Sequence, residues 1–256
     1  MVCADADVKV LITGMNGTVA PVLGRALEMQ GHSVVAWDRN AVPPDSREAC
    51  EQFLASVEPN AICHLATGSA EWAETLASWS AAEGVRLLYT SSVAVFSTAQ
   101  NGPFNVHDEP QPTDEYGRYK LECEQRILAV NSQALVARIG WQIGERAGSN
   151  NMVDYLARTN AAEGGVNASE HWQPACSFLA DTAAALTTLL TDHDARGIYQ
   201  LDGNPGLSFF QIATALSELN AQAWKVRAVA EPDWDQRMID ARVRVAPITA
   251  RLKPRG

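Results

Sequence analysis

Short apolar runs alternate with longer segments of helical periodicity along the first two thirds of the chain. This alternation is typical of βαβ units and predicts a parallel sheet covered by helices. The predicted strands are Lys9–Thr13, Ser33–Trp37, Ala61–Leu65, Val85–Thr90 and Ala134–Arg138. The predicted helices are Val19–Gln30, Ser46–Val57, Ala70–Glu83 and Tyr116–Val130. The pattern therefore predicts an α/β fold with a doubly wound parallel sheet.

Beyond Gly144 the alternation becomes less regular. Polar stretches around Asn150 and over Glu163–Glu170 predict loops. Helices are predicted at Leu179–Leu190 and Ser208–Leu219, and strands at Gly197–Leu201 and Ala223–Val229. We therefore expect a dinucleotide-binding domain over residues 1–144 and a smaller substrate-binding lobe over 145–256, with some segments of the second part returning to the first.

Composition excludes several classes of protein. The 256 residues carry a net charge of −10, which argues against binding nucleic acid or an anionic membrane surface, because both require exposed cations. The five cysteines form no C-x-x-C pair and no metal-ligand spacing, so we expect reduced thiols and no metal site. The sequence shows neither a signal-peptide pattern nor a membrane-length apolar run, and we expect a cytoplasmic protein.

A glycine-containing turn follows the first predicted strand. It reads Thr13-Gly-Met-Asn-Gly-Thr-Val-Ala20, with Gly14 and Gly17 at the turn and Ala20 where the helix must pack closely. Glycines let the backbone approach a pyrophosphate, and the helix N-terminus supplies free N–H groups. The motif predicts a Rossmann-type dinucleotide site, although such a turn can also carry glycines for conformational reasons alone. The cofactor contacts expected in this turn are Gly14, Asn16, Gly17, Thr18 and Val19.

Two further segments complete the expected cofactor site. Asp38 ends the second predicted strand, where an acid can accept hydrogen bonds from the adenosine ribose of NAD. Arg39 follows it and could pair with the 2′-phosphate of NADP, so Asp38 favours NAD(H) whereas Arg39 leaves NADP(H) open. Leu65, Ala66 and Thr67, after the third strand, are also expected to line the cofactor. His64 is expected to be a core or cofactor-lining residue rather than a base.

Candidate catalytic chemistry lies in the Tyr116-Gly-Arg-Tyr-Lys120 segment. Tyr116 and Lys120 are four residues apart at the start of a predicted helix and so share one face. A neighbouring ammonium group would lower the phenol pKa from about 10 and suit it to proton transfer. Ser92 follows the strand Val85–Thr90, at the sheet edge where open α/β folds bind ligands, and could hold a substrate carbonyl toward Tyr116.

These motifs together resemble the extended short-chain dehydrogenase/reductases. The glycine turn, Asp38-Arg39, the Ser-Ser-Val-Ala-Val-Phe segment around Ser92 and the Y-x-x-x-K pair all match that pattern. The sugar-nucleotide branch typified by dTDP-4-dehydrorhamnose reductase is most similar. The acidic, proline-containing approach to Tyr116 and the segment around Trp141 extend the resemblance over most of the chain.

The resemblance implies an NAD(P)-dependent reductase or epimerase that acts on a nucleotide-linked 4-keto sugar. Tyr116 would transfer the proton, Ser92 would polarise the carbonyl, and Lys120 would hold the nicotinamide ribose. Ser92, Val93 and Trp141 would contact the substrate. A homodimer is also expected from this resemblance.

Three departures from the family pattern keep other functions open. The loop Ala66–Ser69 is shorter than usual and has Ser69 where an asparagine is expected. Pro43-Pro44 predicts that the sheet lacks an edge strand, because proline cannot donate to a ladder. The second lobe is short and has no evident basic cluster for a diphosphate. The alternatives are a non-catalytic NAD(P)- or nucleotide-binding protein and a reductase of a smaller carbonyl compound.

Overall fold

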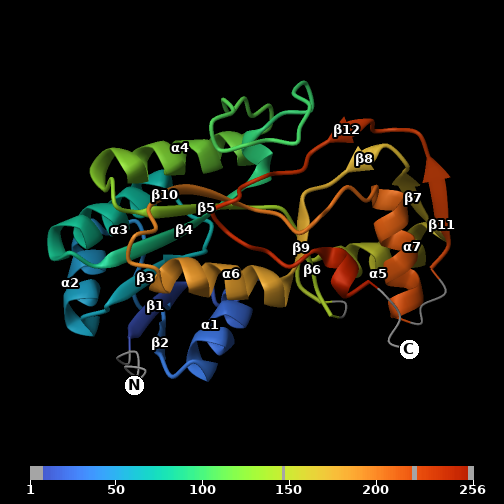
Figure 1. The fold of residues 1–256 in the computed structure, drawn as a ribbon. Helices are drawn as coiled ribbons and strands as arrows, with labels where there is room; N and C mark the ends of the chain where they lie inside the picture. The colour runs from blue at the N-terminus through green and yellow to red at the C-terminus, as the bar shows by residue number, and fades with distance from the viewer. Residues whose placement is uncertain (1–7, 146–147, 221–223, 253–256) are drawn as a thin grey trace, which may run out of the picture.

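A computed structural model describes residues 8–145, 148–220 and 224–252 of the chain. At its centre is a six-stranded parallel sheet in the order β10-β5-β4-β3-β1-β2 (Figure 1). Its strands are β1 (Lys9–Thr13), β2 (Ser33–Ala36), β3 (Ala61–His64), β4 (Arg86–Ser92), β5 (Leu135–Ile139) and β10 (Gly197–Leu201). The predicted α/β fold with a doubly wound parallel sheet is confirmed.

Helices cover both faces of this sheet. Helices α1 (Ala20–Met29) and α6 (Leu179–Thr191) pack on one face, and α2 (Arg47–Val57), α3 (Ala70–Glu83) and α4 (Glu115–Val130) pack on the other (Figure 1). Each helix turns an apolar stripe toward the sheet, as expected from its sequence periodicity. Both faces are therefore sealed, and ligands can reach the sheet only at its edges.

The strand order reverses beside β1. The chain moves from β1 outward to β2 and then returns to place β3 on the other side of β1. At such a reversal the loops after the neighbouring strands diverge and leave a crevice at the carboxyl edge. No strand of the described residues lies beyond β2, and the segment with Pro43-Pro44 forms turns, as predicted.

A second apolar core lies beyond the carboxyl edge of the sheet. It is built on α5 (Met152–Glu163), α7 (Phe209–Leu219) and the parallel pair β7 (Val166–Ser169) and β11 (Val226–Val229). Shorter elements complete the described residues: β6 (Trp141–Ile143), β8 (Trp172–Gln173), β9 (Cys176–Phe178), β12 (Trp234–Asp235) and the 3₁₀ turns η1 (Val93–Val95) and η2 (Ile248–Ala250). Between β9 and α7 the chain returns to the main sheet to form α6 and β10.

Two local predictions were wrong or incomplete in this second part. Glu163–Glu170 was predicted as a loop, but Val166–Ser169 is a strand that pairs with β11. Its partner lies some 60 residues further along the chain, so local polarity could not reveal the pairing. Helix α5 was not predicted. In the predicted strand Ala223–Val229, only Val226–Val229 is a strand, and Ala223 lies outside the described residues.

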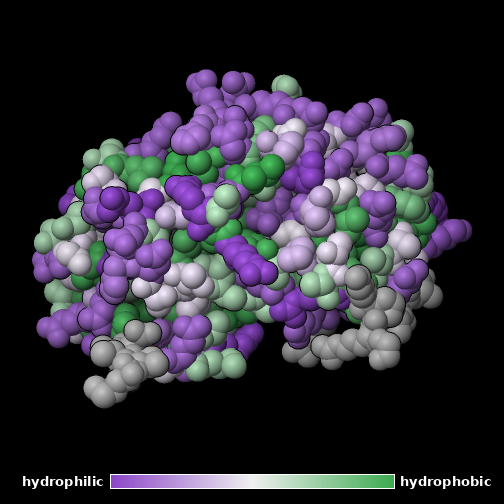
Figure 2. All heavy atoms as spheres, viewed as in Figure 1, coloured by the Kyte–Doolittle hydropathy of each residue, from purple (hydrophilic) through white to green (hydrophobic). Residues whose placement is uncertain are grey.

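The visible surface is mainly hydrophilic (Figure 2), in keeping with the chain's charge of −10. Among residues 8–145, 148–220 and 224–252, no helix combines the length and apolar character needed to cross a bilayer. The same ranges hold no cluster of three or more His, Cys, Asp or Glu side chains able to bind a metal ion. Cys50, Cys63, Cys123 and Cys176 are buried free thiols, whereas Cys3 lies outside the described residues.

Candidate active site

A cleft of about 1160 Å³ lies at the carboxyl edge of the sheet. Every residue that the sequence predicted for catalysis, cofactor binding or substrate binding lines it: Gly14, Asn16, Gly17, Thr18, Val19, Asp38, Arg39, Leu65, Ala66, Thr67, Ser92, Val93, Tyr116, Lys120 and Trp141. The fold therefore brings motifs that are far apart in the sequence into one continuous cavity.

The glycine turn connects β1 to α1 at the floor of this cleft. Gly14 has φ +83°, and a Cβ atom there would lie 2.9 Å from the backbone nitrogen of Ala66, so only glycine fits. The Gly17 N–H donates to the Gly14 carbonyl at 2.8 Å and closes the turn. Helix α1 starts without a side-chain cap, and although Pro21 has no N–H and Val22 donates to the Val19 carbonyl, the N–H of Ala20 is left available to an anion such as a phosphate.

Asp38 and Arg39 lie beside the glycine turn, after β2. One carboxylate oxygen of Asp38 accepts the Asn40 N–H at 2.9 Å. The Arg39 guanidinium donates to the Thr67 carbonyl and lies 5.0 Å above the Trp72 ring. Arg39 therefore joins the loop after β2 to the loop after β3. The sequence analysis left this side chain available to a 2′-phosphate, whereas in the structure it already donates to the Thr67 carbonyl.

The loop after β3 is held against β1 by a buried hydroxyl. Thr13 Oγ1 accepts the N–H groups of Leu65 and Ala66, both at 3.1 Å, and lies 2.8 Å from His64 Nδ1. Burial, with Lys120 and Arg39 nearby, lowers the pKa of His64 to about 3, so this imidazole is neutral at physiological pH. His64 is 1% exposed, which agrees with the predicted core placement and makes it unsuited to act as a base.

The three predicted catalytic residues meet at the junction of β4 and α4. Ser92 and Tyr116 line the same cleft, and the Ser92 hydroxyl is near enough to act on the pKa of the Tyr116 phenol, which it lowers. Lys120, 3% exposed, donates from Nζ to the Thr90 carbonyl at 2.9 Å, and Nζ lies 5.8 Å from the centre of the Tyr116 ring. The fold thus brings Tyr116 and Lys120 of the Y-x-x-x-K pair together with Ser92 at the end of β4.

Gly117 explains how helix α4 comes so close to the end of β4. A Cβ atom at this position would lie 2.1 Å from the Ala94 carbonyl oxygen, so a larger residue would push the helix away. Deeper along α4, Glu124 and Arg138 form a two-point ion pair at 2.7 and 3.0 Å, with both side chains 2% exposed. These contacts fix α4 on the sheet and keep Tyr116 beside Ser92.

The expected lowering of the Tyr116 pKa by Lys120 is wrong. Desolvation raises the pKa of Tyr116, although the residue is 48% exposed, and the interaction with Ser92 only partly offsets this. Lys120 cannot compensate because its ammonium group is directed to the Thr90 carbonyl, and burial lowers its own pKa to about 8. The Tyr116 phenol is consequently protonated at neutral pH.

The wall of the cleft opposite the glycine turn is aromatic and uncharged. Trp141 stacks on Trp172, with ring centres 6.2 Å apart, and Trp172 Nε1 donates to Gln236 Oε1 at 3.3 Å. Gln142 also lines the cleft, whereas Asn150 contacts the glycine turn itself, since its N–H donates to Thr18 Oγ1 at 3.2 Å. The sequence analysis identified Trp141 but missed Trp172 and Gln236. The only local sign of a role for Trp172 was an aromatic residue next to a polar stretch. Its contacts with Trp141 and Gln236 join segments that are distant in the sequence, so the sequence could not reveal them.

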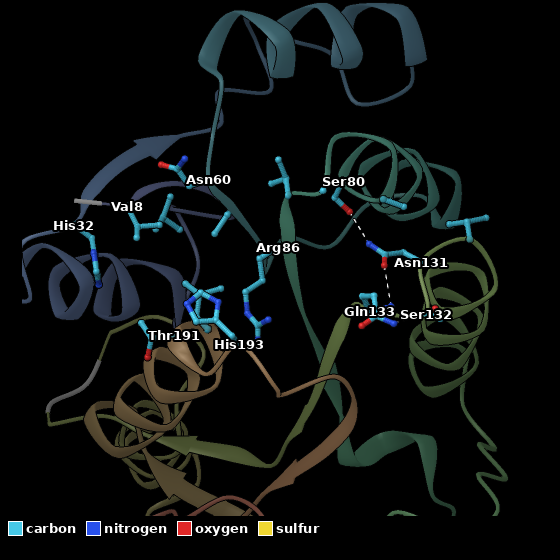
Figure 3. Close-up of a pocket in the computed structure, with 17 residues that line it drawn as sticks. Val8, His32, Asn60, Ser80, Arg86, Asn131, Ser132, Gln133, Thr191 and His193 are labelled. Carbon is cyan, nitrogen blue, oxygen red and sulfur yellow. Dashed lines mark hydrogen bonds between the residues drawn. The ribbon is translucent and has the colours of Figure 1, made fainter. Parts of the chain in front are cut away.

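A second cavity, of about 620 Å³, lies at the opposite edge of the sheet (Figure 3). Its polar side chains mainly stabilise helix ends. Arg86 Nη2 donates to the carbonyl of Leu189 in the last turn of α6 and to those of Asp192 and Ala195 after it, and Asn131 Nδ2 donates to Ser80 Oγ at 2.9 Å. Most of these groups contact the backbone or each other, although His32 Nδ1 and Arg86 Nε are buried without a hydrogen-bond partner among the described residues, and this cavity contains none of the predicted site residues.

The sequence matches the family described as the RmlD substrate binding domain over residues 68–243. The chain belongs to this family. A dTDP-4-dehydrorhamnose reductase of Mycolicibacterium smegmatis is 26% identical over 236 residues, which cover 86% of this chain and 72% of the relative. The methionine adenosyltransferase 2 subunit beta of Bos taurus is 26% identical over 247 residues, which cover 82% of this chain and 71% of the relative.

Solved structures confirm the fold of this RmlD-family protein. The dTDP-4-dehydrorhamnose reductase of Bacillus anthracis, solved in complex with NADP, superposes with a TM-score of 0.83 at 17% identity and covers 96% of this chain and 97% of that one. The family match and the sequence relatives, rather than this fold, confirm the predicted resemblance to the branch typified by dTDP-4-dehydrorhamnose reductase. The expected preference for NAD(H) is not supported, since this neighbour contains NADP while other solved neighbours contain NAD.

Proposed function

We propose that this protein is an NAD(P)(H)-dependent oxidoreductase that reduces the keto group of a nucleotide-linked 4-keto sugar. The observation that carries this proposal is that Ser92, Tyr116 and Lys120 line the same cleft as the glycine turn, with Lys120 Nζ 5.8 Å from the centre of the Tyr116 ring. The cleft volume of about 1160 Å³ exceeds the ~300–1,000 Å³ typical of a single small-molecule site. A dinucleotide and a second ligand can therefore share it.

The cofactor would lie along the carboxyl edge of the sheet. Backbone N–H groups of Thr18, Val19 and Ala20 would hold the diphosphate, because the Gly17 N–H already closes the turn and this helix end has no side-chain cap. Asp38 would accept hydrogen bonds from the adenosine ribose, and Lys120 would hold the ribose of the nicotinamide. The bound nicotinamide supplies the hydride. Both NADH and NADPH remain candidates, because Asp38 favours the first and related structures contain either cofactor.

Tyr116 and its neighbours would supply the proton that the reduced carbonyl oxygen needs. The Tyr116 phenol is protonated at neutral pH, as any tyrosine with a pKa of about 10 or above is, so it can donate to the oxygen of a ketone that gains a hydride. Ser92 would donate a hydrogen bond to the same oxygen and stabilise its developing charge. The protonated state of Tyr116 suits reduction better than oxidation, which would require the phenolate at the start.

The substrate would occupy the side of the cleft lined by Val93 and Trp141. The indole rings of Trp141 and Trp172 offer flat apolar surface, and Gln236 offers a carboxamide whose orientation is set by Trp172. Such groups suit the ring and hydroxyls of a sugar. Epimerisation of a similar substrate would use the same residues.

A non-catalytic role is the main competing function. The short loop Ala66–Ser69 and the relationship to a protein named as a subunit of an adenosyltransferase both favour it. The intact group Ser92, Tyr116 and Lys120 favours catalysis, because binding alone does not require all three. A reductase of a smaller carbonyl compound is a further alternative.

The decisive experiment measures binding and turnover separately. Purified protein is titrated with NADH and NADPH, and oxidation of the bound cofactor is followed after addition of nucleotide-linked 4-keto sugars. Tyr116→Phe should retain cofactor binding and lose at least about 100-fold in turnover, because a general acid contributes about 10²- to 10⁴-fold. Tyr199→Phe, on β10 and away from the cleft, is the matched control. Binding without turnover of any carbonyl substrate would instead support the non-catalytic role.

A further inference from the structure

The loop between β3 and α3 is tied down at each of its residues. Ala66 donates its N–H to Thr13 Oγ1 at 3.1 Å, and the Thr67 carbonyl accepts from Arg39. The Gly68 N–H donates to the Tyr119 hydroxyl at 3.0 Å. Ser69 caps α3 by accepting the N–H of Trp72 at 3.1 Å. Only the Gly68 contact reaches across to α4, the helix that carries Tyr116 and Lys120.

Tyr119 is placed to join this loop to the catalytic helix. It lies between Tyr116 and Lys120 in the sequence, with its ring centre 6.5 Å from that of Tyr116 and 5.5 Å from Lys120 Nζ. It is absent from the lining of the cleft, so it touches neither ligand site directly. Its hydroxyl is engaged by the backbone of the loop.

We propose that Tyr119 is a positioning residue that holds the shortened β3–α3 loop against α4 and so shapes the part of the cofactor cleft lined by Ala66 and Thr67. This inference rests on the proposed function, because the loop matters only if the cleft holds a dinucleotide. The role belongs to a residue inside the Y-x-x-x-K segment that the motif itself leaves undefined. It gives a physical reason why a loop of only four residues can still form an ordered wall.

The surroundings of Gly68 explain why a single hydroxyl has this effect. A Cβ atom on Gly68 would lie 2.6 Å from the Trp72 ring, so the backbone already rests on the indole and cannot relax toward α3. Without the Tyr119 hydroxyl, the Gly68 N–H would donate to water instead. Because the Trp72 ring blocks movement toward α3, the loop would then move away from that helix. Burial raises the pKa of Tyr119 to about 12, so the phenol stays neutral over the working pH range.

The test uses Tyr119→Phe in the full chain, with Tyr199→Phe as the control for loss of a phenol oxygen elsewhere. Amide hydrogen exchange of Gly68 and the dissociation constants for NADH and NADPH are measured on both variants and on the unsubstituted protein. In Tyr119→Phe we expect Gly68 to exchange about tenfold faster and the cofactor to bind about tenfold more weakly, the usual effect of one lost hydrogen bond. Tyr199→Phe should change neither quantity.

Kinetics separate positioning from catalysis. Tyr119→Phe should raise the KM for the cofactor and leave kcat and its pH profile unchanged, whereas Tyr116→Phe should lower kcat. Unchanged Gly68 exchange, or faster exchange with unchanged cofactor affinity, would overturn the role of Tyr119. If the unsubstituted protein binds neither dinucleotide, the proposed function fails, and the exchange rate of Gly68 in Tyr119→Phe then decides alone whether Tyr119 holds the loop.

Discussion

Replacing Thr13 by valine tests how much of the site depends on one buried hydroxyl. Thr13 is fully buried, and its Oγ1 accepts two backbone N–H groups and shares a third hydrogen bond with His64 Nδ1. Valine has nearly the same shape, so the apolar packing of β1 should be preserved. The substitution therefore removes hydrogen bonds without creating a large cavity.

The expected destabilisation follows from the hydrogen bonds that valine cannot make. Each of the three hydrogen bonds to Thr13 Oγ1 contributes about 1 kcal/mol net, and two backbone N–H groups are left buried without an acceptor. We expect the free energy of unfolding of Thr13→Val to fall by about 3 kcal/mol. For a chain of this size, that decrease corresponds to a decrease in Tm of roughly 6–12 °C.

Urea denaturation followed by tryptophan fluorescence measures this change, with Thr13→Ser as the matched variant. Serine keeps the hydroxyl and loses one methyl group, so it should cost only about 1 kcal/mol. Dinucleotide affinity should fall in the valine variant and remain close to normal in the serine variant, because Leu65 and Ala66 line the cleft. The reasoning is refuted if serine destabilises the protein as much as valine does.

Three further changes have defined outcomes. Gly14→Ala should abolish detectable dinucleotide binding in a fluorescence titration while the protein remains folded by circular dichroism, because its Cβ would lie 2.9 Å from Ala66 N and φ is +83°. Lys120 has a pKa of about 8 in the folded protein against 10.5 as the ordinary value, so the unfolded chain binds more protons between these values and the free energy of unfolding should rise from pH 8 to 10.5. Urea denaturation of Lys120→Met should lack this slope, and an equal slope in both proteins would contradict it. Asp202→Asn should lower the free energy of unfolding by about 2 kcal/mol in the same assay, because the Asp202 carboxylate accepts three backbone N–H groups from separate segments and an amide presents only one oxygen. Stability equal to that of the unsubstituted protein would show that water replaces these contacts.

Local sequence signals were sufficient for the main sheet. Strands β1 and β10 and helix α3 match their predicted bounds, because apolar periodicity and flanking glycines mark them directly. In the second part, short strands pair with distant segments, and β7 could not be distinguished from a loop. Its burial is created by α7 and β11, which lie far along the chain.

The sequence by itself determined which chemistry is present: a turn that only glycine can adopt at position 14, and a tyrosine and lysine on one helical face. These features are local, since they depend on backbone conformation and on spacing within a single helix. Tertiary structure decided the rest. Desolvation raises the pKa of Tyr116, the Lys120 ammonium group meets the Thr90 carbonyl of β4, and Tyr119 reaches Gly68 because α3 and α4 pack side by side. Burial and contact between distant segments arise only when the chain is folded, so no spacing rule could have revealed them.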